Sequence, residues 1–440
     1  MRGPNTIQFE ITDDCNLRCL HCYHLDNTEE LEIKFSEANK EKIMKIAQKI
    51  VELGVFSVVI TGGEPLTKKD LVLDLVEFFS DHNISVSLNT NLILLTENFL
   101  KDPRSKLITN FLVSCVSSNT KIYKEMTWNG NYNIFERNLL LLQKYNVRFG
   151  INMVVNTRNL HDIKNTAGHM HNLGVENFYV TPMSLNLYYP DLEHFLTKDQ
   201  VISVVYDLIW IKDKLGMNID ILESLPKCLF PKEILDRKFS FLSRKCQAGV
   251  KTATVNYEGL VRPCSHNPAV YGNILEEDFS LIWDRMKDWR ERKYIPVECG
   301  ECKLSNEDCF GGCRMSAKAF DDEHKTNAVD PWFNCVFKEK IQLYNVMDLN
   351  SIELAINTII SLSGRLQNRL EEDENYSINI AKKNVNMTVS PEVYKMLSYI
   401  EKKEKVSLIN LCGTKEIFHS EKFQYIIKML IAKKYLNIIA

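Results

Sequence analysis

Hydrophobic and polar positions follow two different periods along the first part of the chain. Residues 7–11 alternate apolar and polar side chains, which indicates a strand. Between Ser36 and Gly54, apolar residues recur at helical spacing, with Ser36 placed as an N-cap and Gly54 as a C-cap. The apolar run at 56–60 then predicts a buried strand. The chain is therefore expected to begin with a strand, a helix and a second strand.

This strand–helix alternation continues to about residue 215. Thr67, with Asp70 three residues later, has capping-box spacing and predicts the start of the next helix. The pattern predicts further strands at 84–88, 111–116, 147–155 and 178–182, and helices at 133–145, 160–173 and 199–215. About six such units predict a parallel sheet with outer helices, either doubly wound or a barrel. In both arrangements ligands bind at the carboxyl ends of the strands.

The second half of the chain has a different pattern. Glycine, proline and cysteine punctuate residues 246–335, which indicates a region with little core of its own that folds around metal. Helical patterning returns from Phe337, and the polar stretch at 369–376 predicts a linker. Strands at 377–380 and 385–389 and helices at 391–402, 407–411 and 422–433 are then expected. This tail is interpreted as either a small winged-helix-like unit or a plain helical cap.

Composition narrows the class of protein. A chain of 440 residues predicts two or three domains, and a net charge of −3 gives no reason to expect a polyanion partner. Tail lysines alternate with glutamates, so nucleic-acid binding is not expected. No segment is typical of a signal peptide or membrane span, which predicts a cytoplasmic protein. The 13 cysteines are odd in number and clustered, which favours metal binding over disulfides.

The first cysteine cluster directly follows the first predicted strand. Cys15, Cys19 and Cys22 read C-x3-C-x2-C. Three thiolates would leave one iron of a cubic iron–sulfur cluster without a protein ligand, a position suited to chemistry. Structural zinc, with His21 or His24 as the fourth ligand, is the alternative. The position of the motif at a strand end favours the cluster.

A second motif, Thr61-Gly62-Gly63-Glu64-Pro65, ends the second predicted strand. Its glycines would let a ligand approach the backbone closely, and Glu64 could accept hydrogen bonds from a cationic amine. A simple glycine-rich turn before a helix is the alternative interpretation. Both motifs are predicted at the same end of the same sheet. Together they indicate a ligand site more specifically than either motif does alone.

Together, these two motifs resemble the radical S-adenosylmethionine (SAM) family over roughly residues 5–220. The resemblance implies a partial (β/α)6 barrel with a 4Fe–4S cluster on the three cysteines. SAM would bind the open iron and yield a 5′-deoxyadenosyl radical that abstracts hydrogen from the substrate. The residues that the resemblance places around SAM are Tyr23, Gly62, Gly63, Glu64 and Ser114.

The cysteines between 246 and 335 resemble the SPASM extension of this family. They read C-x12-G-x4-C from Cys246 to Cys264, and C-x2-C-x6-C-x3-C from Cys299 to Cys313. One residue is inserted before Cys309 relative to the usual spacing. The resemblance implies two auxiliary 4Fe–4S clusters, with structural zinc as the alternative. One would lie on Cys299, Cys302, Cys309 and Cys335, and the other on Cys246, Cys264 and Cys313.

The fourth ligand of the cluster on Cys246, Cys264 and Cys313 is left open by the sequence. Cys228 is the nearest upstream cysteine, and it is equally well interpreted as a buried apolar thiol. Without Cys228, this cluster would keep an open iron. Cys115 is expected in the core.

Two departures from the family pattern bear on the substrate. Residues 114–117 lack the acidic residue that many relatives carry, and Ser265 follows Cys264 where sulfatase-maturing relatives have an aspartate. The second departure argues against sulfatase maturation. No catalytic residue is assigned. The candidates for substrate contact at predicted strand ends are Thr61, Asn89, Asn91, Asn152, Asn156 and Tyr188.

The resemblance implies a radical SAM core at 1–225, a SPASM domain at 226–345 and a C-terminal domain at 346–440. The expected activity is maturation of a ribosomally made precursor peptide, docked partly through the tail, by a thioether or other side-chain crosslink. A flavodoxin or ferredoxin would supply electrons. One alternative is a maturase or dehydrogenase that acts on a folded protein or small metabolite. An iron–sulfur electron carrier without catalysis is the other.

Overall fold

The computed structural model covers most of the chain and contains one large sheet and two small ones. The residues that it describes are 3–23, 38–128, 130–187, 190–237, 239–300, 302, 309–333, 349–371, 373–381, 383 and 385–439. The predicted N-cap Ser36, together with His24, Tyr188 and Cys335, lies outside these ranges.

Ten of the described strands form the large sheet, in the order β10-β9-β8-β1-β2-β3-β4-β5-β6-β7. The first seven are β1 (Thr6–Glu10), β2 (Ser57–Thr61), β3 (Ser85–Thr90), β4 (Ile108–Ser114), β5 (Phe149–Val155), β6 (Asn177–Pro182) and β7 (Asn218–Ile221). They are parallel to their neighbours and follow chain order. A doubly wound sheet would reverse its order at a switch point, so this order identifies a partial barrel.

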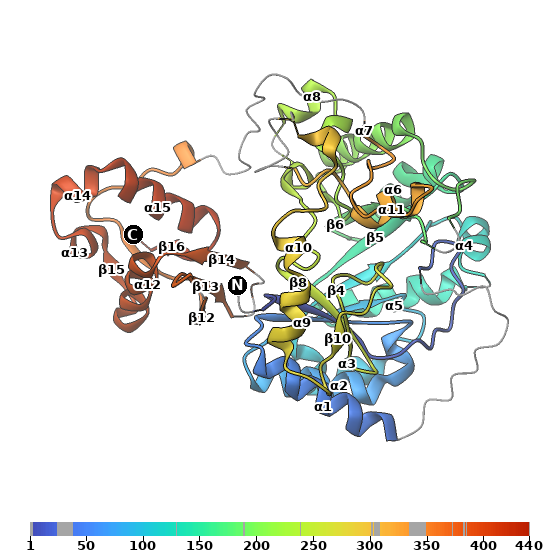
Figure 1. Cartoon of the computed structure of the whole chain (residues 1–440), viewed down its shortest axis with the longest axis horizontal. Helices are drawn as coiled ribbons and strands as arrows, with labels where there is room; N and C mark the ends of the chain where they lie inside the picture. The colour runs from blue at the N-terminus through green and yellow to red at the C-terminus, as the bar shows by residue number, and fades with distance from the viewer. Residues whose placement is uncertain are drawn as a thin grey trace.

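Helices lie outside this curved sheet, as Figure 1 shows. They are α1 (Ala38–Glu52), α2 (Lys69–Asp81), α3 (Glu97–Lys101), α4 (Thr120–Met126), α5 (Tyr132–Lys144), α6 (Ile163–Asn172) and α7 (Lys198–Leu215). The capping box of α7, in which Thr197 and Gln200 bond each other's backbone, and the left-handed Gly216 define its two ends. The predicted alternation is confirmed for these units.

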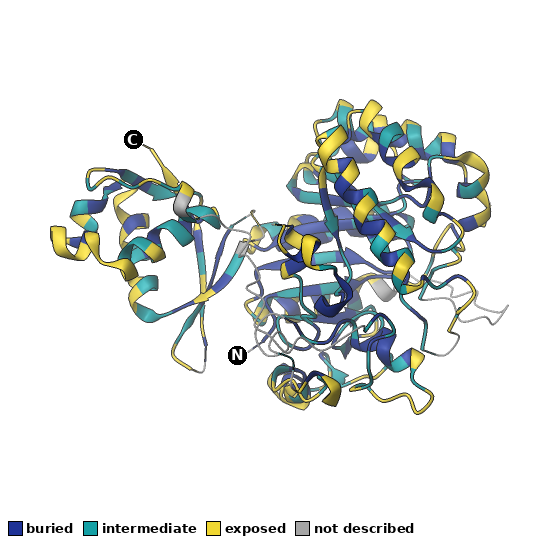
Figure 2. Cartoon of the chain, turned by 90° about the horizontal axis from the view of Figure 1, so that it is seen from above, coloured by how far each residue is buried: buried dark blue, intermediate teal, exposed yellow. Residues whose placement is uncertain are grey.

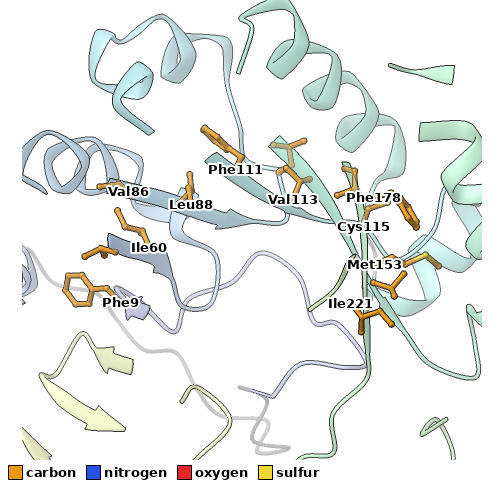
Figure 3. Close-up of a cluster of buried hydrophobic side chains, with 14 of the residues drawn as sticks. Phe9, Ile60, Val86, Leu88, Phe111, Val113, Cys115, Met153, Phe178 and Ile221 are labelled. Carbon is orange, nitrogen blue, oxygen red and sulfur yellow. The ribbon is translucent and has the colours of Figure 1, made fainter. Parts of the chain in front are cut away.

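The strands present different chemistry on their two faces because side chains alternate along a strand. One face carries large apolar residues that pack against the helices, such as Phe9, Ile60 and Phe111, all fully buried. Figure 3 shows these side chains on one side of the strands, with helices beyond them. The opposite face carries Glu10 beside Thr61, and Ser114 beside Asn152, in register. Polar groups are thus gathered inside the barrel.

Two local predictions in this region were incomplete or wrong. The short strand β7 was not predicted, because four residues give too little periodicity. Thr67 is not the N-cap of α2: it lies within the 3-10 turn Pro65–Lys68, whose N-cap is Glu64. The Glu64 carboxylate accepts the backbone N–H of Leu66, a local bond that capping-box spacing does not predict.

The cysteine-rich region joins the large sheet and its core. Its strands are β8 (Thr252–Asn256), β9 (Leu260–Arg262) and β10 (Gly272–Asn273), and β8 pairs in parallel with β1. Its helices are α8 (Lys232–Leu235), α9 (Phe279–Arg285), α10 (Lys287–Arg290) and α11 (Arg314–Phe320). Trp283 and Trp332 from this region are buried in the main apolar cluster. In the part that the structure describes, the cysteine-rich region therefore shares the apolar core of the barrel and does not form one of its own.

The last part of the chain packs around a separate apolar cluster, visible as a second group of buried residues in Figure 2. Its strands are β11 (Ile359–Leu362), β12 (Leu366–Leu370), β13 (Tyr376–Ile380), β14 (Val385–Val389), β15 (Val406–Ser407) and β16 (Leu436–Ile438). Its helices are α12 (Pro391–Lys403), α13 (Leu408–Cys412), α14 (Lys415–His419) and α15 (Glu421–Ala432). We call residues 349–439 the C-terminal unit. Its likeness to a winged helix stays a prediction.

The polar stretch at 369–376 is a hairpin, and its prediction as a linker was wrong. Arg369 lies in β12 and Tyr376 begins β13. The Arg369 guanidinium donates to the carbonyls of Gly3 (2.9 Å) and Pro4 (2.8 Å) and pairs with the buried Glu371 at 2.9 Å. The prediction failed because it treated charged residues as solvent-exposed. Arg369 and Glu371 are instead largely buried, and Arg369 joins the C-terminal unit to the start of the barrel.

Candidate functional site

The loop of the first three cysteines follows β1 and lies at the carboxyl edge of the parallel strands. Its backbone is fixed to the end of α4, because Arg18 N donates to Thr127 O (3.3 Å) and Leu20 N to Met126 O (2.9 Å). Asn91, just after β3, donates to Asn16 Oδ1 at 2.9 Å. The cysteine loop is therefore attached to two elements that are distant from it in the sequence.

The glycine-rich turn after β2 packs directly against this loop. Gly63 N donates to Thr12 O (2.7 Å), and Glu64 N donates to Asp14 O (2.7 Å). A Cβ at Gly62 would overlap the carbonyl oxygen of Thr12, and a Cβ at Gly63 that of Asp14. In the structure, both glycines are therefore required by the close approach of the cysteine loop itself.

The side chain of Glu64 connects the turn to β3. Its Oε1 accepts Thr90 Oγ1 (2.7 Å) and Leu66 N (2.9 Å), and its Oε2 accepts Asn91 N (2.7 Å). Burial raises the pKa of this carboxyl to about 7, an effect that the three hydrogen bonds oppose. Glu64 thus fixes the position of Asn91, the residue that donates to the cysteine loop. Its Oε2 atom keeps a lone pair that could accept a further hydrogen bond.

The thiols of the first cysteine cluster need a bound cation to ionise. Burial raises the pKa of Cys15 to about 11 and raises that of Cys19 further, so a bound cation is needed to hold them as thiolates. Leu17 N donates to Cys15 Sγ at 3.4 Å, a bond typical of cluster sulfurs. Zinc and iron–sulfur clusters both bind such thiolates.

A small cavity separates the first cysteine loop from the cysteine-rich region. It measures about 70 Å3 and is lined by Tyr23, Leu185, Asn186, Leu187, Arg262, Ser265, His266 and Pro268. The rings of Tyr23 and His266 lie 4.4 Å apart. Nearby, His21 Nδ1 is buried and has no hydrogen-bond partner among the described groups, and burial lowers its pKa to about 4. A neutral polar atom without a partner beside the cysteine loop suits a ligand site.

A buried ion pair closes one side of the barrel interior. Glu10, at the end of β1, is 1% exposed and bonds Arg262 of β9. Burial raises the pKa of Glu10 to about 7, which the arginine opposes. Tyr257 OH also donates to Asp13 Oδ2 at 2.7 Å. The cysteine-rich region therefore touches both the first strand and the first cysteine loop.

The β8–β9 hairpin brings two auxiliary cysteines together. Cys246 precedes β8 and Cys264 follows β9, so the antiparallel pairing returns both to one end. Gly259 makes the turn with a φ of 89°, which explains the glycine in the motif. Cys313 interacts electrostatically with both Cys246 and Cys264, which places it with them. We call Cys246, Cys264 and Cys313 the hairpin set.

The remaining described cysteines of the region form another group. Cys299, Cys302 and Cys309 interact electrostatically, and burial raises the pKa of Cys299 to about 12. Cys309 Sγ accepts N–H bonds from Lys227 (3.5 Å) and Gly311 (3.3 Å). Cys228 interacts with Cys299, so the structure places it with this group, which we call the second set. Cys335 lies outside the described residues.

The structure also places the other candidate residues. Ser114, Thr61, Asn89 and Asn152 share the inner face of the sheet, and Asn152 Oδ1 accepts Thr181 Oγ1 at 2.8 Å. Asn156 is fully buried and bonds its own loop. Cys115, also buried, lies in the apolar core as expected. Asn91 alone among these candidates contacts the cysteine loop directly.

Three residues of the site were not singled out from the sequence: Arg262, Glu223 and Asp330. Glu223 follows the unpredicted strand β7 and accepts Ser184 Oγ at 2.7 Å. Asp330 is 2% exposed and accepts Cys313 N at 2.9 Å. Acidic residues in loops carry no periodic signal, so only the tertiary structure shows that they lie beside cysteines.

Comparison with known families agrees with this geometry. Residues 9–170 match the radical SAM superfamily, and residues 246–303 match the SPASM iron–sulfur cluster-binding domain. The chain is therefore a radical SAM enzyme. More narrowly, it combines the radical SAM domain with a SPASM domain, so SAM and iron–sulfur clusters are its cofactors.

Individual relatives are distant. The chain is 24% identical to the AdoMet-dependent heme synthase of Methanosarcina barkeri, over 72% of this chain and 93% of the relative. It is 23% identical to AlbA, the antilisterial bacteriocin subtilosin biosynthesis protein of Bacillus subtilis, over 79% and 74%. The fold resembles Streptococcus suis SuiB bound to its precursor peptide SuiA, with a TM-score of 0.58, 19% identity and coverage of 74% and 75%.

No helix in the described part of the chain is long and apolar enough to cross a membrane.

Proposed function

We propose that this enzyme modifies a ribosomally made precursor peptide in the cytoplasm, forming a thioether or another side-chain crosslink. The observation that carries the proposal is the cavity between the first cysteine loop and the hairpin set. A substrate side chain held there would meet the radical on one side and an electron acceptor on the other. The similarity to AlbA and to peptide-bound SuiB supports a peptide over other substrates.

The first cluster would be held by Cys15, Cys19 and Cys22. When bound there together, cluster and SAM would supply a 5′-deoxyadenosyl radical that abstracts a hydrogen atom from the peptide. Gly62, Gly63 and Glu64 would orient the amino group of SAM, Tyr23 would bound its adenine, and Ser114 would face it from the inner side of β4. The ion pair of Glu10 with Arg262, which closes one side of the barrel interior, would limit the access of bulk water.

Two auxiliary clusters complete the proposed set of three 4Fe–4S centres. The hairpin set would hold the one nearer the cavity, because Ser265 and His266 follow Cys264 directly into its lining. The second set, with Cys335, would hold the other. A flavodoxin or ferredoxin would reduce the first cluster, and the auxiliary clusters would accept the surplus electron from the substrate.

The C-terminal unit is proposed to dock the leader segment of the peptide. It has its own apolar core and is attached through Arg369 to the backbone just before β1, so a leader bound to it would run along the barrel to reach the carboxyl edge that carries the site. Extended peptides commonly add a strand to an exposed sheet edge. The described edge strands of its two sheets are β12, β14, β15 and β16.

The experiment is anaerobic incubation of the reconstituted, reduced enzyme with SAM and peptides encoded by neighbouring short reading frames. We expect a peptide lighter by two hydrogens and one 5′-deoxyadenosine per product. Deoxyadenosine formation with every peptide mass unchanged would exclude these peptides as substrates. No deoxyadenosine under reducing conditions would instead favour an electron carrier.

A small metabolite is the second candidate substrate, because the heme synthase relative is matched over 93% of its length. In that case the C-terminal unit would be dispensable for turnover. Tetrapyrrole substrates tested in parallel with the peptides separate the two proposals, since only one class should be consumed in step with SAM.

A further inference from the structure

The two groups of SPASM cysteines differ in which other side chains lie beside them. Cys228, the upstream cysteine, lies with the second set: its neighbour Lys227 donates its N–H to Cys309 Sγ at 3.5 Å, and Cys228 itself interacts with Cys299. The hairpin set therefore has three cysteines and needs another donor if all four irons of its cluster are to have protein ligands.

The carboxylate of Glu223 lies beside the hairpin set. Glu223 follows β7, the strand at the far end of the large sheet from β8 and β9. Leu222 N donates to Val180 O at 2.9 Å, which extends the line of β7 by one residue and places Glu223 at the carboxyl edge of the sheet. Glu223 Oε2 accepts Ser184 Oγ at 2.7 Å, and Oε1 accepts Ser224 N at 2.7 Å. These two bonds orient the carboxylate and leave lone pairs on both oxygens.

Two contacts bring the hairpin set to this carboxylate. Arg244, two residues before Cys246, pairs with Asp220 of β7 at 2.8 Å. Ser265 and His266, directly after Cys264, line the same cavity as Leu185, the residue after Ser184. One end of the β8–β9 hairpin therefore contacts β7 just before Glu223, and the other lines a cavity with the neighbour of Ser184, which bonds Glu223.

Electrostatic interactions agree with this placement. Glu223 lies within electrostatic interaction range of Cys246, Cys264 and Cys313. Asp330 lies nearby too, and its two oxygens accept the backbone N–H groups of Cys313 and Trp332. Glu223 therefore interacts with all three thiols of the hairpin set.

We propose that Glu223 is the fourth protein ligand of the auxiliary cluster held by the hairpin set, and that Cys228 is not. This assignment rests on the proposed function for the presence of that cluster. One carboxylate oxygen would bind the iron that the three thiolates leave open. That iron would then differ from its neighbours, because an oxygen donor is harder than a thiolate.

The test uses the full chain with Cys15, Cys19 and Cys22 changed to alanine, so that only auxiliary clusters assemble. Each protein is reconstituted anaerobically with 57Fe and examined by Mössbauer and electron paramagnetic resonance spectroscopy and by iron analysis. Glu223→Gln keeps the shape of the side chain but removes its charge. Glu223→Cys supplies a thiolate instead, and Cys228→Ser is the matched control.

We expect one iron site with oxygen ligation in the parent protein. Glu223→Gln should lose that site and, on mild oxidation, one iron of the cluster on the hairpin set, giving a [3Fe–4S] signal. Glu223→Cys should keep all four irons of that cluster but lose the oxygen-ligated site, and Cys228→Ser should retain that site.

An unchanged spectrum and iron content in Glu223→Gln would overturn the ligand assignment, as would loss of this site in Cys228→Ser. A parent protein without auxiliary iron would overturn the cluster assignment and the ligand with it. SAM cleavage by the chain with its first three cysteines intact tests the proposed function separately from either result.

Discussion

At the scale of single residues, the site depends on how closely two loops approach each other. Gly63 and Glu64 donate backbone N–H groups to carbonyls of the cysteine loop, and a Cβ at Gly63 would overlap one of those carbonyls. Glu64 then fixes Asn91 through its buried carboxylate. The glycines and the glutamate therefore build the cysteine loop before any cofactor binds.

Gly63→Ala should displace the cysteine loop, since the new methyl group and the Asp14 carbonyl oxygen cannot share one position. We expect less iron and sulfide per chain after anaerobic purification, and SAM cleavage lowered by roughly tenfold or more. Gly168→Ala in α6 is the control, because a Cβ there meets nothing within 4 Å. The control should be neutral or stabilised by about 0.5–1 kcal/mol. Equal iron content in the two variants would contradict the prediction.

Glu10 should make stability depend on pH. Its folded pKa, about 7, lies above the ordinary 4.5, so the unfolded chain releases this proton first as pH rises. The free energy of unfolding should therefore fall between pH 4.5 and 7, by up to about 3 kcal/mol from this group at roughly 1.4 kcal/mol per unit.

Glu10→Gln cannot titrate and should lose this dependence. Anaerobic denaturant midpoints at pH 5 and pH 7.5 measure the difference between the two proteins. Glu41→Gln, at an exposed position of α1, is the control and should follow the wild type. A parallel pH profile for Glu10→Gln and the wild type would show that the carboxyl titrates normally.

At the scale of elements, one arginine joins two parts of the molecule. Arg369 of β12 donates to backbone carbonyls before β1 and pairs with the buried Glu371. Its Nη1 also reaches Leu53 O, just past the end of α1, at 3.4 Å. A cation at this position stabilises the carboxyl end of a helix. β12 thus pairs with β13 in its own hairpin and, through Arg369, also binds the backbone at the start of the barrel.

Arg369→Ala should release the C-terminal unit from the barrel, because it leaves Glu371 buried without its cation. Breaking such a pair costs about 3–5 kcal/mol. Hydrogen exchange at the end of α1 and in β12 should accelerate, while SAM cleavage without peptide stays within about twofold. Arg365→Ala, which loses one exposed bond to Asn83, should change exchange little. Unchanged exchange in Arg369→Ala would place the joint elsewhere.

At the scale of the whole molecule, two apolar clusters with no member in common support two units. A chain that ends at residue 348 should therefore keep its barrel core and cleave SAM at a rate within about twofold of the full chain. Turnover of the precursor peptide should need at least roughly tenfold more peptide, about 1.4 kcal/mol of lost docking. Peptide titrations of deoxyadenosine and product formation measure both quantities. An unchanged peptide requirement would remove the C-terminal unit from substrate binding.

The amino-acid sequence by itself determined the kind of chemistry at the site and the order of most strands and helices along the chain. Thiolates at fixed spacing after a strand, a glycine-rich turn after the next strand, and repeated helical and strand periods are local features, so they are readable without a structure. Strand ends of parallel neighbours meet at one edge, which is why Cys15 and Glu64 could be placed together in advance.

Only the tertiary structure decided contacts between segments far apart in sequence. The sequential order of β1 to β7, the parallel pairing of β8 with β1, and the burial of Arg369 all depend on which strands meet. Cys228 and Glu223 are five residues apart, yet they lie beside different sets of cysteines. Periodicity and spacing record only local geometry. A side chain's partner across the fold is set by packing of the whole chain, so those partners could not be read from the sequence.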